Sequence, residues 1–410
     1  MKIFVFVEIF PSRYKPYYDS QFVDLLDSGH ELTIFAYRSE PGARNAAVVA
    51  HGLTSLVEYY PTTLRHLPQF VVPFLANLVR HPLKSLRASV AGFRMRASFT
   101  ARIASAFRAV LVARESPDFI LIHSAWTAVA FRWLGSYFSN VPIATYYHGG
   151  EIPGTPELGQ SVLTEAFQSA DAIFTNTEFS RNQAISRGAS PPSVLIQPVG
   201  FDLRGFPPLD HREYRRDGIL RVVSAGRLSP EKGHLFAIKA VHRLVENGHR
   251  NVHYSIAGSG PLAGEIGRHI QEYGLEDHVT LLGTILTDDL FKLMRKSDVL
   301  MLPSQRVGTS AETQAAVVQE AMLCGALPVV SRTGGAPECI PPEFERFLVD
   351  EGDWEAMADA LEQILAMDPE TMADLGNRGR AFVEENFRVA TMNEFIIQRT
   401  LEMRERPRAS

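Results

Sequence analysis

Short, continuous runs of apolar residues recur along the chain and are separated by longer amphipathic stretches. Runs without polar alternation are typical of strands buried on both faces of a parallel sheet that helices cover. The pattern predicts strands over Lys2–Val7, Glu31–Ala36, Asp118–His123, Pro142–Tyr147, Asp171–Thr177, Ser193–Pro198, Leu220–Ala225, Val252–Ala257, Val279–Leu282, Val299–Pro303, Leu327–Ser331 and Arg346–Val349. Strands that alternate with helices indicate the α/β class with a doubly wound architecture.

The strand series restarts near residue 205. Pro207-Pro208 and the charged stretch from Asp210 to Asp217 separate the two halves, and such an interval is typical of a linker. A chain of 410 residues also suits two domains of about 200 residues each. We therefore expect an N-terminal domain over 1–205, a C-terminal domain over 206–385 and a terminal helical segment over 386–410, since Phe382–Met403 is amphipathic.

Composition adds little to this picture. The net charge of −5 argues neither for nor against an anionic partner, and no nucleic acid is expected. Cys324 and Cys339 are too few for a disulfide framework and suit a reducing compartment. The apolar start is too short for a signal peptide, and no run approaches the roughly 18 residues of a membrane span. We expect a cytoplasmic protein that is either soluble or attached peripherally to the inner face of the cell membrane.

The densest cluster of chemically capable residues contains two glutamates. Glu312 and Glu320 have seven residues between them, and a helix that ends at Gly325 would place Glu320 two turns inside it. Glu312 would then lie at the junction of loop and helix. A carboxylate can accept two hydroxyl hydrogen bonds from a sugar or ribose diol. Taken alone, the spacing is more typical of a solvated helix with two surface glutamates.

Two cations follow the predicted strand Leu220–Ala225. Arg227 and Lys232 lie in a loop at the carboxyl end of this strand, where open α/β sheets bind ligands. Together they could neutralise a departing diphosphate without a metal ion. In agreement, the chain has no Asp-x-Asp pair of the kind that holds a metal-bound diphosphate. A loop of this charge can also be merely solvated.

Glycine-bearing loops follow other strands of the second half. Gly258 and Gly260 come after Val252–Ala257, and Gly334-Gly335 comes after Leu327–Ser331. Glycine lets a backbone approach phosphate or sugar closely, but each loop can equally be a tight turn. Thr284, after Val279–Leu282, completes this set of candidate substrate contacts.

Taken in order, these elements resemble the C-terminal half of the retaining family-4 glycosyltransferases, a group that includes polysaccharide and lipid-sugar transferases. The resemblance extends into the first half through Tyr147-His148-Gly149-Gly150, Thr175-Asn176-Thr177 and Val199-Gly200-Phe201-Asp202. It implies the GT-B fold, in which two Rossmann-like domains face each other across a cleft. It also implies that the segment 386–410 crosses back to the N-terminal domain.

The resemblance implies a function and roles for individual residues. The reaction would be metal-independent transfer of a sugar from a UDP- or GDP-sugar to a glycan or lipid-linked acceptor, as in cell-surface or exopolysaccharide synthesis. Arg227 and Lys232 would bind the donor diphosphate, and Glu320 would hold the ribose. Glu312 would lie by the donor sugar, and His148 would lie next to the transferred sugar.

Two stretches depart from the family pattern. Members commonly have a small, glycine-containing stretch directly after the first glutamate, where this chain has Thr313, Gln314 and Ala315 as candidate sugar contacts. The usual glycine-rich loop after the first strand is replaced by the stretch from Phe10 to Tyr18, which would border the acceptor.

Two other interpretations of the function compete with this one. Gly258, Gly260 and Ala263 fit the dinucleotide fingerprint of a dehydrogenase, but Glu276 and Asp277 come before the next strand instead of at its end. A non-catalytic nucleotide-sugar-binding protein of the same fold is the second alternative. The joint presence of both cations and both glutamates argues against it.

The interval 59–114 has no acidic residue and a local charge of +9. Its cations are Arg65, Arg80, Lys84, Arg87, Arg94, Arg96, Arg102, Arg108 and Arg114. Interleaved apolar residues include Leu67, Phe70, Val71, Val72, Phe74, Leu75, Leu78, Val79 and Leu83. A basic amphipathic segment of this kind can lie in the interface of an anionic membrane. Alternatively, its apolar residues line the core of the first domain.

Overall fold

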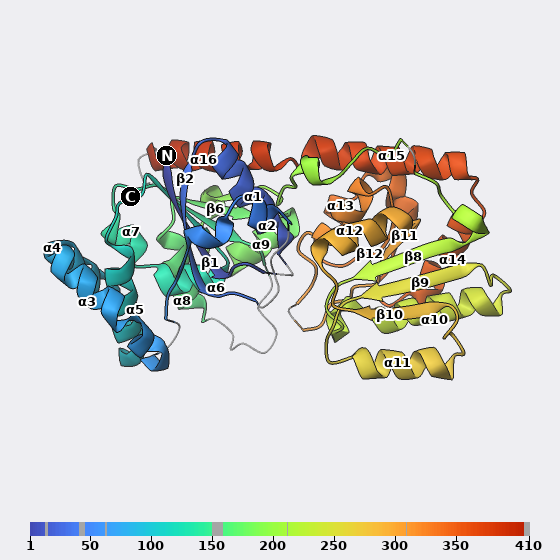
Figure 1. Cartoon of the computed structure of the whole chain (residues 1–410), viewed down its shortest axis with the longest axis horizontal. Coiled ribbons are helices and arrows are strands. Elements are labelled where there is room, and N and C mark those ends of the chain that lie inside the picture. Colours follow the sequence, from blue (N-terminus) through green and yellow to red (C-terminus); the bar gives the residue numbers. More distant parts are fainter. Residues whose placement is uncertain are drawn as a thin grey trace. The chain divides into compact units, whose positions relative to one another are not determined.

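The computed structural model describes residues 1–12, 15–40, 46–61, 64–149, 159–210, 212–308 and 310–405 (Figure 1). The chain divides into two compact units. Unit 1 comprises Met1–Pro198 together with Val389–Ser410, and unit 2 comprises Val199–Arg388.

Unit 1 is built on a seven-stranded parallel sheet in the order β3-β2-β1-β4-β5-β6-β7. Its strands are β1 Lys2–Ile9, β2 Glu31–Arg38, β3 Val57–Tyr59, β4 Phe119–His123, β5 Ile143–Tyr147, β6 Ala172–Thr175 and β7 Val194–Ile196. In the register, Ile3 of β1 lies opposite Leu32 of β2 and Phe119 of β4. The strand order reverses between β1 and β4, which is the point where open α/β sheets bind ligands.

Helices connect these strands. They are α1 Pro16–Asp27, α2 Ala46–Ala50, α3 Val71–Arg80, α4 Pro82–Phe93, α5 Phe99–Val112, α6 Ala125–Phe131, α7 Leu134–Tyr137, α8 Gln160–Gln168, α9 Glu178–Ser186 and α16 Val389–Glu405, with short 3₁₀ turns at Leu53–Leu56, Leu64–Phe70 and Pro191–Ser193. The interior of β1, from Ile3 to Val7, is almost fully buried because helices cover both faces of the sheet. Figure 1 shows α3, α4 and α5 together at one edge of unit 1.

Unit 2 has a six-stranded parallel sheet in the order β10-β9-β8-β11-β12-β13. Its strands are β8 Leu220–Ala225, β9 Val252–Ala257, β10 Val279–Gly283, β11 Val299–Leu302, β12 Leu327–Ser331 and β13 Leu348–Val349. Its helices are α10 His234–Glu246, α11 Ala263–Glu272, α12 Thr287–Lys296, α13 Ala316–Leu323, α14 Trp354–Leu365 and α15 Pro369–Asn386. Short 3₁₀ turns lie at Leu203–Gly205, Arg216–Gly218, Pro230–Lys232, Ala336–Cys339 and Pro342–Phe347.

The predicted α/β doubly wound architecture is confirmed in both units. Every predicted strand is present, and its ends lie within two residues of the prediction. The sequence pattern missed β3. This strand has only three residues, none of them fully buried, and carries Glu58 at its centre, so it gives no apolar run.

The boundary between the units lies at Pro198–Val199 and not at residue 205. The backbone of Val199 is bonded to the side chain of Gln314, and the N–H of Phe201 donates to the carbonyl of Phe387 at 2.8 Å. Phe206 is buried in the core of unit 2. Residues 199–206 therefore pack with the second sheet.

The terminal segment is two helices, not one amphipathic helix over Phe382–Met403. Helix α15 ends at Asn386, because the carbonyl of Phe387 accepts the hydrogen bond from Phe201 and the chain leaves the helix there. Helix α16 belongs to unit 1, where Gln21 Nε2 of α1 donates to Asn393 Oδ1 at 3.0 Å. This hydrogen bond is buried and fixes α16 against α1.

None of the helices in the described ranges is long and apolar enough to cross a membrane. Cys324 and Cys339 are both buried free thiols.

Candidate functional site

In unit 2 the candidate donor residues lie in loops at the carboxyl ends of three strands. Arg227 and Lys232 lie between β8 and α10, Gly258 and Gly260 follow β9, and Ser304 follows β11. Because β8, β9 and β11 are parallel neighbours, their carboxyl ends meet at one edge of the sheet. Residues far apart in sequence are thus brought together there.

Lys232 and Glu312 form the central pair of this edge. The Lys232 ammonium donates directly to Glu312 Oε1, and Ser304 Oγ donates to the same oxygen at 2.7 Å. Burial raises the pKa of the Glu312 carboxyl, but Lys232, Ser304 and Arg227 outweigh burial and hold the pKa below its ordinary value. Glu312 is therefore a carboxylate at neutral pH, with a cation already aligned beside it.

Arg227 has a different setting. Its Nη2 lies 2.8 Å from Glu231 Oε1, which also accepts a hydrogen bond from Ser229 Oγ at 2.7 Å. The Arg227 side chain is 43% exposed, whereas that of Glu231 is 13% exposed. The guanidinium is thus anchored on one side and open to an incoming anion on the other.

Glu320 is the unusual residue of α13. It is only 5% exposed, and within the described residues no neighbouring charge or hydrogen-bond donor offsets the effect of burial on its carboxyl group. Burial raises the pKa of this carboxyl to about 8. An enclosed carboxyl without a partner is costly to keep in a fold, so its position is typical of a group that awaits a ligand.

The stretch after Glu312 contains three sequence candidates that differ in setting. The Gln314 amide is buried and forms both of its hydrogen bonds with Val199, accepting from N at 2.7 Å and donating to O at 3.0 Å. The side chain therefore holds the beginning of unit 2 and does not face open space. Ala315 has a φ of 57°, a conformation that favours glycine, and Thr313 is half-buried.

The glycines have a packing role in the structure. A Cβ on Gly258 would lie 1.8 Å from the carbonyl oxygen of Gly226, and one on Gly260 would lie 2.4 Å from that of Leu228. A Cβ on Gly334 would lie 2.0 Å from the carbonyl oxygen of Glu312. These glycines let the loop after β9 pack backbone against backbone on the loop after β8, and the loop after β12 on the loop after β11.

The remaining candidate of unit 2 is Thr284, at the end of β10. It is exposed, and its hydroxyl donates to Ser259 Oγ at 2.9 Å. This bond links the loop after β10 to the loop after β9.

In unit 1, His148 lies at the end of β5 within a group of stacked rings. His123 Nδ1 and His148 Nε2 are 3.0 Å apart, and the two rings are parallel within 5°. Tyr146 stacks on His148 with a distance of 4.5 Å between the ring centroids. Tyr17 of α1 also contacts the His148 ring, with a centroid distance of 5.4 Å. The ring of His148 is therefore held in one orientation.

Both histidines of this group are neutral at physiological pH. Burial, with the nearby Lys15 ammonium, lowers the pKa of His148 to about 3. Burial also lowers the pKa of His123 well below its ordinary value, with smaller contributions from His148 and Lys15. A neutral imidazole can form a hydrogen bond with a hydroxyl group but cannot supply a positive charge.

An ion pair lies next to the histidines. Glu8, at the end of β1, accepts a hydrogen bond from Ser124 Oγ at 3.1 Å and lies 3.4 Å from Lys15 Nζ. Ser124 begins α6 with a φ of 77°, which is strained for a residue other than glycine. Strained residues at the carboxyl end of a central strand are typical of functional sites.

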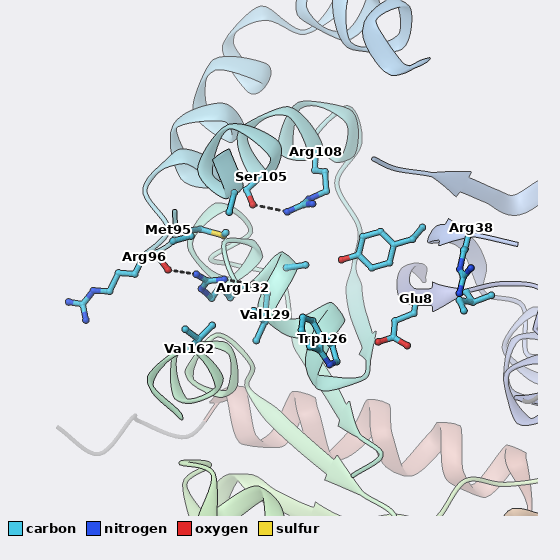
Figure 2. A pocket seen from close by; sticks show the side chains of 15 residues that line it. Glu8, Arg38, Met95, Arg96, Ser105, Arg108, Trp126, Val129, Arg132 and Val162 are labelled. Carbon is cyan, nitrogen blue, oxygen red and sulfur yellow. Dashed lines mark hydrogen bonds between the residues drawn. The ribbon is translucent and has the colours of Figure 1, made fainter. Parts of the chain in front are cut away.

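Beside Glu8, unit 1 has a cavity of about 650 Å³ (Figure 2). Two nearly buried arginines line it: Arg108 donates to Ser105 Oγ at 2.8 Å, and Arg132 donates to the carbonyl of Arg96 at 2.5 Å. Otherwise the lining is mainly apolar. Trp126 also lines it, and its buried indole N–H has no hydrogen-bond partner in the described part of the chain. The cavity thus suits a ligand with both apolar and anionic parts.

Within the described ranges, no group of three or more His, Cys, Asp or Glu side chains is placed to hold a metal ion.

Comparison with known families identifies the class of protein. The family described as "Glycosyl transferases group 1" matches residues 210–382, and the "Glycosyl transferase 4-like domain" matches residues 17–200. The chain belongs to the family-4 type of glycosyltransferases. The two matches cover most of unit 2 and of unit 1, so the resemblance found in the sequence is confirmed.

Relatives of this glycosyltransferase include the "putative colanic acid biosynthesis glycosyltransferase WcaL" of Salmonella typhimurium, 27% identical over 96% of this chain and 98% of the relative. Another is the GDP-mannose-dependent alpha-(1-6)-phosphatidylinositol monomannoside mannosyltransferase of Mycobacterium tuberculosis, 26% identical over 60% of this chain and 66% of the relative. Among solved structures, Anabaena HepE in complex with UDP and glucose matches with a TM-score of 0.69 and 20% identity over 98% of this chain and all of that one. The predicted GT-B fold is thereby confirmed.

The sequence analysis did not identify several polar residues that lie near His148 in this glycosyltransferase. Glu8, Lys15, His123 and Ser124 join His148 at the carboxyl ends of β1, β4 and β5. A signal was present, because Glu8 is the one charged residue between Ile3 and Ile9 in an otherwise apolar run. Arg13, Tyr14 and Gly150, which belong to the predicted acceptor loop and histidine motif, lie outside the described residues.

Proposed function

We propose that this glycosyltransferase moves a sugar from a nucleoside diphosphate sugar, with a uridine or guanosine base, to a glycan or lipid-linked acceptor. The transfer retains the anomeric configuration and needs no metal ion. The observation that carries the proposal is the edge of unit 2, where Lys232, Arg227 and Glu312 lie at strand ends. The enclosed, unpartnered Glu320 on α13 supports it.

The two cations suit the departure of a diphosphate. Negative charge develops on the leaving oxygen in the transition state, and prealigned cations stabilise it in place of a metal ion. Lys232 is paired with Glu312, and Ser304 shares that carboxylate. A diphosphate would compete with Glu312 for the ammonium group while Ser304 still satisfies the carboxylate.

The carboxyl groups suit the remaining parts of the donor. Glu320 would accept one hydrogen bond from each ribose hydroxyl group through its two carboxylate oxygens. Glu312 would lie by the donor sugar, and the neutral imidazole of His148 would hold a hydroxyl of the transferred sugar. As the family resemblance implies, the leaving phosphate would accept the proton of the acceptor hydroxyl on the same face of the sugar.

For the acceptor we propose the cavity of unit 1. Its apolar lining with Arg108 and Arg132 suits an acceptor that joins sugars to a lipid phosphate, and Glu8 lies at its margin (Figure 2). Support also comes from the names of the relatives, which refer to colanic acid biosynthesis and to a phosphatidylinositol mannoside. Both point to assembly of polysaccharide or lipid-linked sugar.

The stereochemistry and the metal requirement can be tested together. Proton NMR follows the anomeric configuration of the sugar as it is transferred from UDP- and GDP-sugars, with and without EDTA. We expect the product to keep the configuration of the donor and the rate to be unchanged by EDTA. Inversion, or loss of activity with EDTA and recovery with Mg²⁺ or Mn²⁺, would contradict the proposal.

A further inference from the structure

Helices α3 and α4 of unit 1 each present a row of apolar side chains to solvent. On α3 the row consists of Val72, Leu75 and Val79, and on α4 of Leu83, Leu86 and Val90. In both helices the members are spaced by three and then four residues, which places them on one face. Val79 and Leu83, on either side of the bend between the helices, are 82% and 76% exposed.

The opposite faces of the two helices are packed, so the exposed rows are not part of an incomplete core. Asn77 of α3 is buried and donates to the carbonyl of Val110 on α5 at 3.3 Å. Ser85 of α4 is buried and donates to the carbonyl of Asn77 at 3.1 Å. A Cβ on Gly92 would lie 2.6 Å from the carbonyl oxygen of Ser105, so α4 and α5 are in close backbone contact. Polar residues thus face inward and apolar residues face outward.

The charges on these helices and the loop after them are all of one sign. Between Glu58 and Glu115 there is no acidic residue, and Arg80, Lys84, Arg87, Arg94 and Arg96 are exposed. Across the described ranges, none of these five forms an ion pair. The other cations of the interval are used inside the fold: Arg102 and Arg108 donate to backbone carbonyls, and Arg114 pairs with Glu58. The Arg65 side chain lies outside the described residues.

We propose that α3 and α4 dock the protein on an anionic membrane surface. In this arrangement the apolar rows are buried among lipid headgroups and acyl chains, and the five exposed cations lie at the level of the lipid phosphates. A second copy of the chain would cover the apolar rows but would bring the same positive charges together. Charge complementarity therefore selects anionic lipid as the occupant.

Docking would place the acceptor close to its cavity. A second cavity, of about 640 Å³, is lined by Leu86 and Val90 of the exposed row and shares Met95 and Arg132 with the cavity assigned to the acceptor. A lipid-linked acceptor could thus extend from the membrane along apolar and arginine side chains. Only this path of the acceptor from the membrane to its cavity rests on the proposed function; the docking surface does not.

Co-sedimentation of the full chain with vesicles, without nucleotide, tests the docking. Vesicles of phosphatidylcholine with phosphatidylglycerol should bind the protein, vesicles of phosphatidylcholine alone should not, and binding should fall as salt rises. The double variant Val79→Asn/Leu83→Gln should bind at least about tenfold more weakly, because both side chains lose apolar burial. The control Leu286→Gln changes an exposed leucine of unit 2 and should bind as the wild type does.

The charge is tested by Lys84→Glu with Arg87→Glu. Each cation near an anionic surface contributes about 1 kcal/mol, which is about fivefold in binding, so the double reversal should weaken binding at least about 25-fold. Arg250→Glu reverses an exposed cation of unit 2 and should have no effect. Absence of wild-type binding to anionic vesicles at low salt would overturn the proposal, as would unchanged binding by both double variants.

Analytical ultracentrifugation excludes the second occupant. We expect the wild type and Val79→Asn/Leu83→Gln to have the same oligomeric state. A wild-type dimer that dissociates in this variant would instead assign the apolar rows to a second copy of the chain. Nucleotide binding by the same variants, followed with UDP and GDP, should be unchanged. Failure of docking with intact nucleotide binding would therefore leave the proposed transfer reaction standing.

Discussion

At the scale of single residues, Glu320 is an ionisable side chain in a buried environment that disfavours its charged form. Its carboxyl is almost completely enclosed and has a pKa of about 8, so it is largely protonated at pH 7. A carboxylic acid has one acceptor oxygen fewer to offer than a carboxylate, because one oxygen carries the proton. Binding of a ribose diol would favour the ionised form and release that proton.

The pH dependence of nucleotide binding follows from this argument. The affinity for UDP or GDP should rise by up to about tenfold per pH unit between pH 6.5 and 8, and level off above the pKa of Glu320. Titration calorimetry at several pH values measures it. In Glu320→Gln the rise of nucleotide affinity that comes from ionisation of Glu320 should disappear. The affinity at pH 8.5 should fall by about tenfold or more. Titration of the nucleotide itself is common to both proteins, so an unchanged profile in the variant would contradict the role of Glu320.

His148 gives a second prediction at this scale. Its neutral ring is fixed by His123 and Tyr146, and it lies in unit 1, whereas the diphosphate-binding candidates lie in unit 2. The variant His148→Ala should lower the rate of sugar transfer at least about tenfold, because a positioned hydrogen bond to the sugar is lost. The affinity for UDP or GDP should change by less than about twofold. A parallel loss of nucleotide affinity would assign His148 a structural role.

At the scale of elements, strands were predictable and loops were not. Buried parallel strands leave continuous apolar runs in the sequence, which is why their ends were located within two residues. The loops after β8, β9 and β12 depend on contacts between distant segments, such as Gly258 with Gly226 and Gly334 with Glu312. Such contacts leave no periodic pattern, so a packing glycine and a ligand-binding glycine look alike in the sequence.

Gln314 and Ala315 show the same limit. The sequence pattern predicts Gln314 as a sugar contact because it follows Glu312. In the structure its amide is hydrogen-bonded to the backbone of Val199, more than one hundred residues earlier in the chain. Ala315 has a positive φ of 57°, a conformation that glycine adopts without strain, so the alanine at this position carries some backbone strain that its sequence neighbours do not reveal.

In the basic interval, the sequence predicted the composition of the surface but not its orientation. Apolar and basic residues are interleaved there, which fits both a core-facing and a lipid-facing arrangement. The structure shows that Phe74 stacks on Phe107, whereas Val72, Val79 and Leu83 face solvent and Asn77 and Ser85 face inward. Only the packing of α3 and α4 on α5 determines which face is covered.

At the scale of the whole molecule, the candidate site residues are divided between two units, each built on its own parallel sheet. Unit 2 carries both cations and both glutamates of the candidate donor site, and unit 1 carries the histidines, Glu8 and the large cavity. The restart of the strand series near residue 205 made this division predictable. The return of residues 389–410 to unit 1 could be expected only from the family resemblance, because buried bonds such as Gln21–Asn393 join opposite ends of the sequence.

The central claim is that Lys232 stabilises a departing nucleoside diphosphate. Release of UDP or GDP from a panel of UDP- and GDP-sugars tests it most directly, measured on the wild type, on Lys232→Ala and on the control Lys296→Ala, which removes an exposed lysine of α12. Circular dichroism verifies that the variants are folded. We predict release from at least one donor by the wild type and the control, and a rate at least about 100-fold lower in Lys232→Ala. Release by Lys232→Ala at the wild-type rate would contradict the claim.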